Sequence, residues 1–286
     1  MKELTIKKNI EPFIACDSEF GDAEIVIFGA PFDGTASFRP GARYAPKAVR
    51  AESFGIETYS PYQDRDLNDI HVCDYGDLEL PFGNTAKTLL MIEDFTDFLC
   101  SHNKLPFMIG GEHLVTLGAV KSILRRDHDL HVIQFDAHAD LRDDYLGERL
   151  SHATVMRRIW ELTGDGKIHQ FGIRSGERAE FEFARKHTHM CKYGLDKIEK
   201  TVQELDGKPV YLTVDVDVLD PSVLPGTGTP EAGGVIFYEL FMALLKLSSL
   251  NIVGCDITEL SPIYDRDGIS TITACKLIRE ILLISV

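Results

Sequence analysis

Uninterrupted apolar runs alternate along this chain with segments of helical periodicity, and this alternation restricts the fold more than any other feature of the sequence. A strand made almost entirely of apolar residues belongs in a parallel sheet that is buried on both faces. Right-handed crossover helices then form the outer layers. The predicted fold class is α/β, a three-layer α/β/α arrangement with a mainly parallel central sheet. The predicted strands are residues 24–31, 106–111, 131–136, 167–173, 209–216 and 251–257.

Amphipathic segments between and after these strands supply the predicted helices. A chain of 286 residues, 44% of them hydrophobic, has ample material for a core. No linker, repeat or low-complexity segment divides it, so we expect residues 1–286 to form a single domain. The predicted helices are residues 87–103, 114–126, 153–164, 178–187, 236–249 and 271–284.

Composition excludes some classes of partner. The 45 acidic residues outnumber the 30 Lys and Arg residues, so the formal net charge of −15 leaves no basic footprint for a nucleic acid and weakly favours cationic ligands. The six scattered cysteines form no Cys-x-x-Cys pair, which favours buried thiols in a reducing compartment. Residues 1–10 lack the apolar core of a signal peptide, and no apolar stretch reaches membrane-spanning length. We therefore expect a cytoplasmic protein with no membrane partner.

Polar side chains with metal-binding chemistry gather where three predicted strands end. Residues two apart on a strand project from the same face, and ligands of parallel α/β sheets lie beyond the carboxyl ends of the strands. A lone Asp after a strand is usually a turn residue or a helix cap, but three strands that end alike are harder to explain in that way. The candidate metal ligands are His113, Asp136, His138, Asp140, Asp215 and Asp217.

Four carboxylates in one place repel one another unless cations neutralise them. Two divalent ions balance four negative charges. The mixture of carboxylate and imidazole suits Mn²⁺, with Zn²⁺, Fe²⁺ and Co²⁺ as alternatives. Two ions about 3.5–4 Å apart can hold one bridging water and lower its pKa, which makes hydroxide available near neutral pH. The sequence thus predicts two metal ions, Mn²⁺ first, that prepare a nucleophile.

Other catalytic motifs fit less well. Residues 226–234 are glycine-rich but lack dinucleotide-binding spacing and contain Pro230. Residues 215–220 resemble the start of a calcium loop without its glycine and closing glutamate. The chain has no Gly-x-Ser-x-Gly elbow.

Five segments of the chain resemble the ureohydrolases, the arginase and agmatinase family. Three carry its signatures: "GGEH" at 110–113, "FDAHAD" at 135–140, and "VDVDVLDPS…PGTGTPEAGG" within 214–234. Residues 29–50 and 256–265 extend the match over nearly the whole chain. The resemblance implies an arginase-like α/β/α fold, a binuclear manganese centre, and hydrolysis of a guanidino group to urea and an amine. It also implies a homo-oligomer, since relatives form trimers or hexamers.

The family pattern also implies how the ligands are shared between the ions. The first ion would be held by His113, Asp136, Asp140 and Asp215. The second would be held by His138, Asp136, Asp215 and Asp217. Asp136 and Asp215 would therefore bridge the two ions.

Three residues match the catalytic pattern of the family. Asp140 would accept a hydrogen bond from the bridging hydroxide, Glu259 would pair with the substrate guanidinium, and His152 would carry a proton near the leaving amine. From the residues alone, Glu259 resembles a turn carboxylate before Pro262, and His152 resembles a loop histidine exposed to solvent.

The expected substrate is agmatine, which would give putrescine and urea. The segment 141–152 lacks the Asn and the "SGN" stretch with which arginases grip an α-amino acid. It is rich in acids instead, with Asp143, Asp144 and Glu148 suited to a cationic tail, and Glu231 is a second candidate for that role. Arg142 is the exception, because it could receive the carboxylate of 4-guanidinobutyrate.

Other functions stay open at this stage. Within the family, the alternatives are a guanidinobutyrase, an arginase or a formiminoglutamase. Outside it, the chain could be a catalytically silent relative that binds metal or serves in an assembly. A single-zinc amide hydrolase of the related deacetylase group is another alternative, although it would not need the second set of ligands.

Overall fold

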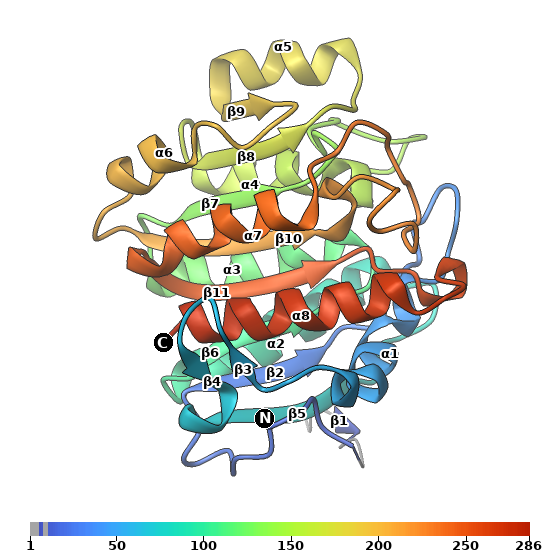
Figure 1. The fold of residues 1–286 in the computed structure, drawn as a ribbon. Coiled ribbons are helices and arrows are strands. Elements are labelled where there is room, and N and C mark those ends of the chain that lie inside the picture. The colour runs from blue at the N-terminus through green and yellow to red at the C-terminus, as the bar shows by residue number, and fades with distance from the viewer. Residues whose placement is uncertain (1–5, 8–10) are drawn as a thin grey trace.

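The computed structural model describes residues 6–7 and 11–286, so most of the N-terminal segment interpreted above lies outside it. A nine-stranded sheet crosses the molecule in the order β1-β5-β2-β6-β11-β10-β7-β8-β9 (Figure 1). Every pairing is parallel except that of β1 with β5. The strands are β1 (Ile6–Lys7), β2 (Ile25–Gly29), β5 (Val72–Leu78), β6 (Leu105–Ile109), β7 (His131–Phe135), β8 (Ile168–Ile173), β9 (His189–Lys192), β10 (Pro209–Asp215) and β11 (Asn251–Thr258). A separate short hairpin pairs β3 (Tyr59–Ser60) with β4 (Arg65–Asp66).

Helices cover both faces of the sheet, which confirms the predicted α/β/α class (Figure 1). One layer contains α2, α3 and α4, with α5 beside α4, and the other contains α1, α8, α7 and α6. The helices are α1 (Ala45–Glu52), α2 (Thr85–Ser101), α3 (Thr116–Arg126), α4 (Val155–Thr163), α5 (Arg178–His187), α6 (Ile198–Glu204), α7 (Phe237–Lys246) and α8 (Ile269–Ile284).

Two apolar clusters hold these layers together, one on each face of the sheet. Strand β10 contributes to both, because Leu212 and Val214 face one cluster and Tyr211 faces the other. All of these side chains are fully buried. Burial on both faces is the physical reason that the run "PVYLTV" shows no polar alternation.

The order of the strands positions the candidate ligands. Strands β6, β11, β10 and β7 are consecutive neighbours in the sheet. They are parallel, so their carboxyl ends meet at one edge. Three of them precede the predicted ligands, and the fourth precedes Glu259. Segments more than a hundred residues apart in sequence thus deliver side chains to one place.

All six predicted strands and all six predicted helices are present, with ends shifted by a few residues. The sequence analysis missed β5, whose acidic residues disguise it as a loop. One of them, Asp74, is buried and accepts hydrogen bonds from the Arg50 side chain and from the backbone N–H of Phe13. Helix α1, which provides Arg50, was also missed, as were the short elements β9 and α6. In β5, the buried ion pair between Asp74 and Arg50 stands where the prediction required apolar residues.

Two further expectations were that the cysteines are buried and that no helix spans a membrane. All six cysteines are buried. Among the described residues, none of the helices combines the length and apolar character needed to cross a bilayer.

A group of histidines lies at the amino-terminal end of the sheet, opposite the candidate ligands. His169 of β8 is buried, with Nε2 at 3.1 Å from Nδ1 of His131 and its ring stacked on that of His189. Lys167 and Asp129 lie beside His131. Burial, followed by the nearby charges of His189, His131 and Lys167, lowers the pKa of His169 to about 3. The folded protein therefore holds this imidazole neutral.

We predict that His169 makes the protein sensitive to acid. Its pKa in the unfolded chain is about 6.5, so the unfolded chain takes up a proton first as the pH falls, and the free energy of unfolding decreases from about pH 6.5 downward. The contribution is about 2 kcal/mol between pH 6.5 and 4.5. Urea denaturation across this range should show a smaller decrease for His169→Gln than for the wild type. Parallel curves would contradict the assignment, because every other acid-sensitive group is common to both proteins.

Candidate metal centre and adjoining cavity

His113 follows β6 after a tight glycine turn. Gly111 approaches the backbone of Phe32 so closely that a Cβ atom there would lie 1.8 Å from the Phe32 carbonyl oxygen. A 3-10 helix, His113–Val115, then directs the imidazole across the ends of the neighbouring strands. The side chain is buried. Close packing therefore requires glycine at position 111 of "GGEH", and this turn positions His113.

Two other strands deliver the acidic residues and the second histidine. Strand β7 ends at Phe135, and Asp136, His138 and Asp140 follow in a loop rather than in continued extended geometry. Asp140 adopts a positive φ of 54°. Strand β10 ends at Asp215, and Asp217 lies in the 3-10 helix Val216–Val218.

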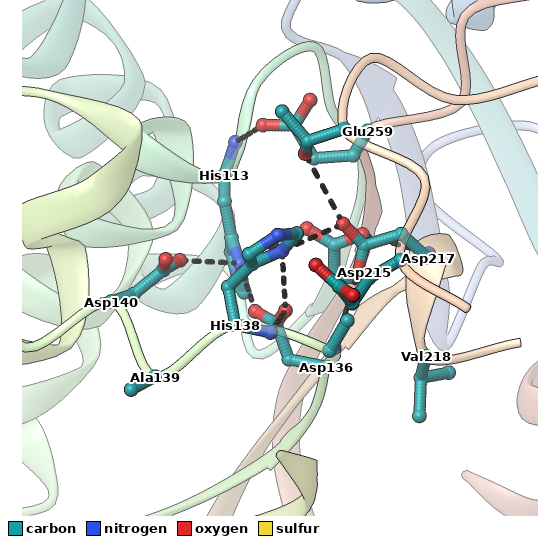
Figure 2. Close-up of polar contacts among 12 residues, drawn as sticks. His113, Asp136, His138, Ala139, Asp140, Asp215, Asp217, Val218 and Glu259 are labelled. Atoms are coloured by element: carbon teal, nitrogen blue, oxygen red, sulfur yellow. Dashed lines mark hydrogen bonds and ion pairs between the residues drawn. The ribbon is translucent and has the colours of Figure 1, made fainter. Parts of the chain in front are cut away.

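These side chains converge, as Figure 2 shows, while those of Ala139 and Val218 point away. Nδ1 of His113 lies 2.9 Å from Asp136 Oδ2, 3.2 Å from Asp140 Oδ2 and 3.4 Å from Asp215 Oδ2. Nδ1 of His138 lies 2.9 Å from Asp217 Oδ2 and 3.6 Å from Asp136 Oδ1. Two groups of donor atoms result, and Asp136 belongs to both. The structure thus brings together all six predicted ligands.

Backbone amides hold three of the carboxylates in place. His138 N–H donates to Asp136 Oδ1 at 2.6 Å, Asp217 N–H donates to Asp215 Oδ1 at 2.9 Å, and Ala137 N–H donates to Asp217 Oδ1 at 3.1 Å. One oxygen of each carboxylate is therefore fixed by the loop itself. The other oxygen of each lies near an imidazole nitrogen.

The electrostatics of this group fit divalent cations. Burial and the neighbouring Asp217 and Asp136 raise the pKa of Asp215 well above its usual range. Burial and Asp136 also raise the pKa of Asp140, to about 7. Burial by itself would lower the pKa of each histidine, but the surrounding carboxylates raise both pKa values well above normal. So much concentrated negative charge binds protons unless metal ions replace them.

The donor atoms satisfy the chemistry of such ions as well. His113 Nδ1 is buried and has no hydrogen-bond partner among the described residues, although it faces three carboxylates. A set of carboxylate oxygens and imidazole nitrogens suits Mn²⁺, and also Zn²⁺, Fe²⁺ and Co²⁺. The residues present therefore fit two divalent ions that share Asp136.

Glu259 lies beside this cluster, after the end of β11. It is buried, and its φ of 65° is unusual for a residue with a side chain. Its Oε1 accepts a hydrogen bond from the backbone N–H of His113 at 2.7 Å (Figure 2). Burial, followed by the charge of Glu112, raises the pKa of Glu259 well above its usual range. A cation in the adjoining cavity would relieve this repulsion.

His152 also lines the cavity beside the cluster. Its Nε2 is 3.2 Å from Ser37 Oγ, and its Nδ1 is 3.4 Å from Thr35 Oγ1. The Thr35 hydroxyl in turn donates to Glu112 at 2.6 Å. Burial lowers the pKa of His152 to about 4, so the imidazole is neutral at pH 7. The sequence alone suggested a histidine exposed to solvent, but the His152 side chain is partly buried.

A cavity of about 290 Å³ joins these groups. Its inner wall includes His138, Asp140, Asp215 and Glu259, and His152 lines it farther out. Its outer wall includes Arg142, Tyr145, Ser175, Glu177 and Glu180. The cavity thus extends from the carboxylate cluster toward a second set of charged residues.

Arg142 lies in this outer wall, but carboxylates already engage it. Its guanidinium is 3.1 Å from Glu177 Oε1 and 3.5 Å from Glu180 Oε2, and it lies over the ring of Tyr145. The sequence analysis did not single out Glu177 or Glu180. Both stand at the start of α5, where they form a capping box whose spacing is visible in the sequence.

The acidic residues suggested for the substrate tail do not line the cavity. Asp143 is mostly exposed and pairs with Arg158 at 2.9 Å. The backbone oxygen of Glu231 accepts hydrogen bonds from Arg174, and its carboxylate is not part of the wall. Asp144 and Glu148 are also absent from it. Glu177 and Glu180 occupy the position that these residues were expected to hold.

Known proteins resemble this chain over nearly its whole length. The model of the arginase family matches residues 23–284. An agmatinase from Bacillus subtilis is 45% identical over 95% of each chain. The crystal structure of an agmatine ureohydrolase of Thermoplasma volcanium has a TM-score of 0.88 at 33% identity, covering 97% of this chain and 94% of that one. A guanidinobutyrase from Pseudomonas aeruginosa is 32% identical over 95% of this chain and 89% of its own length.

We predict that Asp136 and Asp217 differ in their effects on metal content. Asp136 belongs to both groups of donor atoms, whereas Asp217 belongs to one. After dialysis against Mn²⁺ and removal of free metal, Asp136→Asn should retain neither ion, and Asp217→Asn should retain one. Elemental analysis of the purified proteins gives the number of ions per chain. Two ions bound to Asp136→Asn would rule out the shared position.

Proposed function

This chain belongs to the arginase family, and from that premise we propose that it hydrolyses the guanidino group of agmatine to give putrescine and urea. It is an enzyme of the ureohydrolase type, by its similarity to agmatinases and to the family as a whole. The observation that carries the finer assignment is the charge of the outer cavity wall, where two carboxylates face one arginine. We propose that residues 1–286 act as one domain of a cytoplasmic homo-oligomer, a trimer or a hexamer.

We propose that two Mn²⁺ ions occupy the carboxylate cluster. His113, Asp136, Asp140 and Asp215 would hold one, and Asp136, His138, Asp215 and Asp217 the other. When bound, such a pair supplies a hydroxide nucleophile near neutral pH. The contribution of the chain is to hold three of the carboxylates through backbone amides and to place the ligands at the inner end of the cavity.

Glu259 is proposed to bind the substrate guanidinium. A carboxylate matches the two parallel N–H groups of a guanidinium, and this geometry fixes orientation as well as charge. The hydrogen bond from His113 N–H holds Glu259 in one position next to the ligands. The reacting carbon is then kept at the inner end of the cavity, and such positioning accounts for a large part of a barrier reduction.

Departure of the amine requires a proton on its nitrogen. Asp140 and His152 both line the cavity, and we propose that they carry this proton in turn. Asp140 offers a carboxylate oxygen that can accept a proton and pass it on. The neutral His152 can accept one at Nε2, the atom that lies beside Ser37.

The outer wall favours a cationic tail. Glu177, Glu180 and Arg142 together carry a net charge of −1, and Glu177 is the most exposed of the three. The terminal ammonium of agmatine would be attracted to Glu177. A carboxylate tail would have to separate Arg142 from its two partners. Guanidinobutyrate is the second candidate substrate, because Arg142 could receive its carboxylate if it left those partners.

The substrate assignment predicts a ranking of three compounds. The value of kcat/KM for agmatine should exceed those for arginine and 4-guanidinobutyrate by about 10²-fold or more, because each of the latter leaves a carboxylate without a suitable partner. Urea release by the Mn²⁺-loaded protein measures all three. Equal values for arginine and agmatine would reject the agmatine assignment while leaving the ureohydrolase chemistry intact.

The role of Glu177 can be tested separately. Glu177→Gln should lower kcat/KM for agmatine roughly 3- to 5-fold, since an exposed ion pair contributes about 1 kcal/mol or less. It should also raise the relative rate with guanidinobutyrate, because Arg142 loses a partner. The matched control is Glu182→Gln, on the same helix but outside the cavity wall. A similar effect of both changes would show that general surface charge, not Glu177, sets the preference.

Glu259→Gln should keep both metal ions and lose most of its activity. The amide retains an oxygen for His113 N–H but lacks the charge that pairs with the guanidinium. Loss of one partner from a buried charge pair costs about 2–5 kcal/mol, so kcat/KM should fall at least 30-fold. Urea release and metal content are measured on the same preparation. Wild-type activity in this variant would place the guanidinium elsewhere.

A further inference from the structure

A buried carboxylate in β11 collects three hydroxyl groups behind the metal centre. Asp256 is fully buried. Its Oδ2 accepts hydrogen bonds from Tyr211 at 2.6 Å and Thr116 at 2.8 Å, and its Oδ1 accepts one from Thr213 at 2.6 Å. None of these residues lines the substrate cavity. The proposed reaction gives Asp256 no part.

The direction of these hydrogen bonds determines the next one. An ionised carboxylate can only accept, so each of the three hydroxyl protons is committed to Asp256. Thr213 then has only lone pairs for its other neighbour. That neighbour is Nε2 of His113, at 2.9 Å, and it must therefore be the donor.

A proton on Nε2 leaves Nδ1 of a neutral His113 as a lone pair. Nδ1 is the atom that faces Asp136, Asp140 and Asp215, and it has no hydrogen-bond partner in the part of the chain that the structure describes. A lone pair cannot bond to carboxylate oxygens without a cation between them. Nε2 of His113 thus donates a hydrogen bond to Thr213, and Nδ1 has a lone pair available for a metal ion.

We propose that Asp256 is a positioning residue that acts through Thr213 to fix the tautomer and orientation of His113 for metal binding. The relay Asp256–Thr213–His113 serves one ion of the pair. No equivalent hydrogen bond to Nε2 of His138 occurs in the described part of the chain, and that side chain is 25% exposed. The two ions should therefore respond differently when the relay is broken.

Two substitutions break the relay at different points. Thr213→Val removes the acceptor for Nε2–H at nearly constant volume. Asp256→Asn keeps the bonds from Tyr211 and Thr116 if its amide NH₂ faces Thr213, whose own proton must then point at His113. Either change favours a proton on Nδ1, where it competes with the ion. Thr213→Ser preserves the hydroxyl and should behave as the wild type.

The test is Mn²⁺ titration of the metal-free proteins by calorimetry. Partners of this kind typically contribute 10- to 100-fold to metal affinity, so the dissociation constant of one ion should rise by that factor in Thr213→Val and Asp256→Asn. The other ion should change by no more than a few-fold. Thr96→Val is the matched control, because Thr96 is also buried but its hydroxyl has no partner in the described residues. Thermal unfolding of each metal-free protein separates loss of affinity from loss of the fold.

Wild-type affinities in both relay variants would overturn the proposal, as would an equal loss in Thr96→Val. The proposal rests on the metal centre proposed above, and the two can fail separately. A wild-type protein that binds no ion rejects the centre itself, whereas two ions bound equally well by wild type and variants reject only the relay.

A second measurement requires no relay variant. In the Zn²⁺-loaded protein with ¹⁵N-labelled histidine, the His113 ring should carry a proton on Nε2 that exchanges slowly with water. The signal is assigned by its absence from His113→Gln. A proton on Nδ1, or an Nε2 proton that exchanges freely, would overturn the proposal.

Discussion

The concentration of negative charge at the carboxyl ends of two adjacent parallel strands, β7 and β10, is the constraint on which the site depends. Asp136, Asp140, Asp215 and Asp217 are all buried, and burial of even one unpaired carboxylate is costly. Bound protons or metal cations must therefore offset these charges. The fold accepts this arrangement because backbone amides in the same loops each hold one oxygen in place. Metal binding is therefore expected to stabilise the local fold of these loops.

The rest of the molecule serves to bring these ends together at the inner end of one cavity. The four strands involved are adjacent and buried on both faces, so their positions are fixed by the core rather than by the site. The loops beyond them add Glu259 and His152 to the cavity wall, and α5 adds Glu177 and Glu180, which we propose meet the distal end of the substrate. Rigid strands thus fix the positions of the loops and short 3-10 helices that carry the candidate site residues.

Much of this could be read from the sequence, and the exceptions have physical causes. Apolar runs identified six strands, and polar residues after three of them identified every member of the carboxylate and histidine cluster. Strand β5 was missed because Asp74 is paired with Arg50, which lies on a different element. Glu177 and Asp256 were missed for the same reason: one acts on Arg142 and the other on Thr213, and neither contact is local in the sequence. Asp143 was favoured because it closely follows Asp140 in the chain, and Glu231 because it lies in the segment "TPEAGG". Neither reason decides where a side chain points.

The central claim is that the two histidines and four aspartates of the cluster hold two metal ions, and that both ions share Asp136. Anomalous diffraction from crystals grown with Mn²⁺ tests it most directly. The account predicts two manganese peaks per chain. One lies among His113, Asp136, Asp140 and Asp215, and the other lies among Asp136, His138, Asp215 and Asp217. A single peak, or peaks that do not contact Asp136, would contradict it.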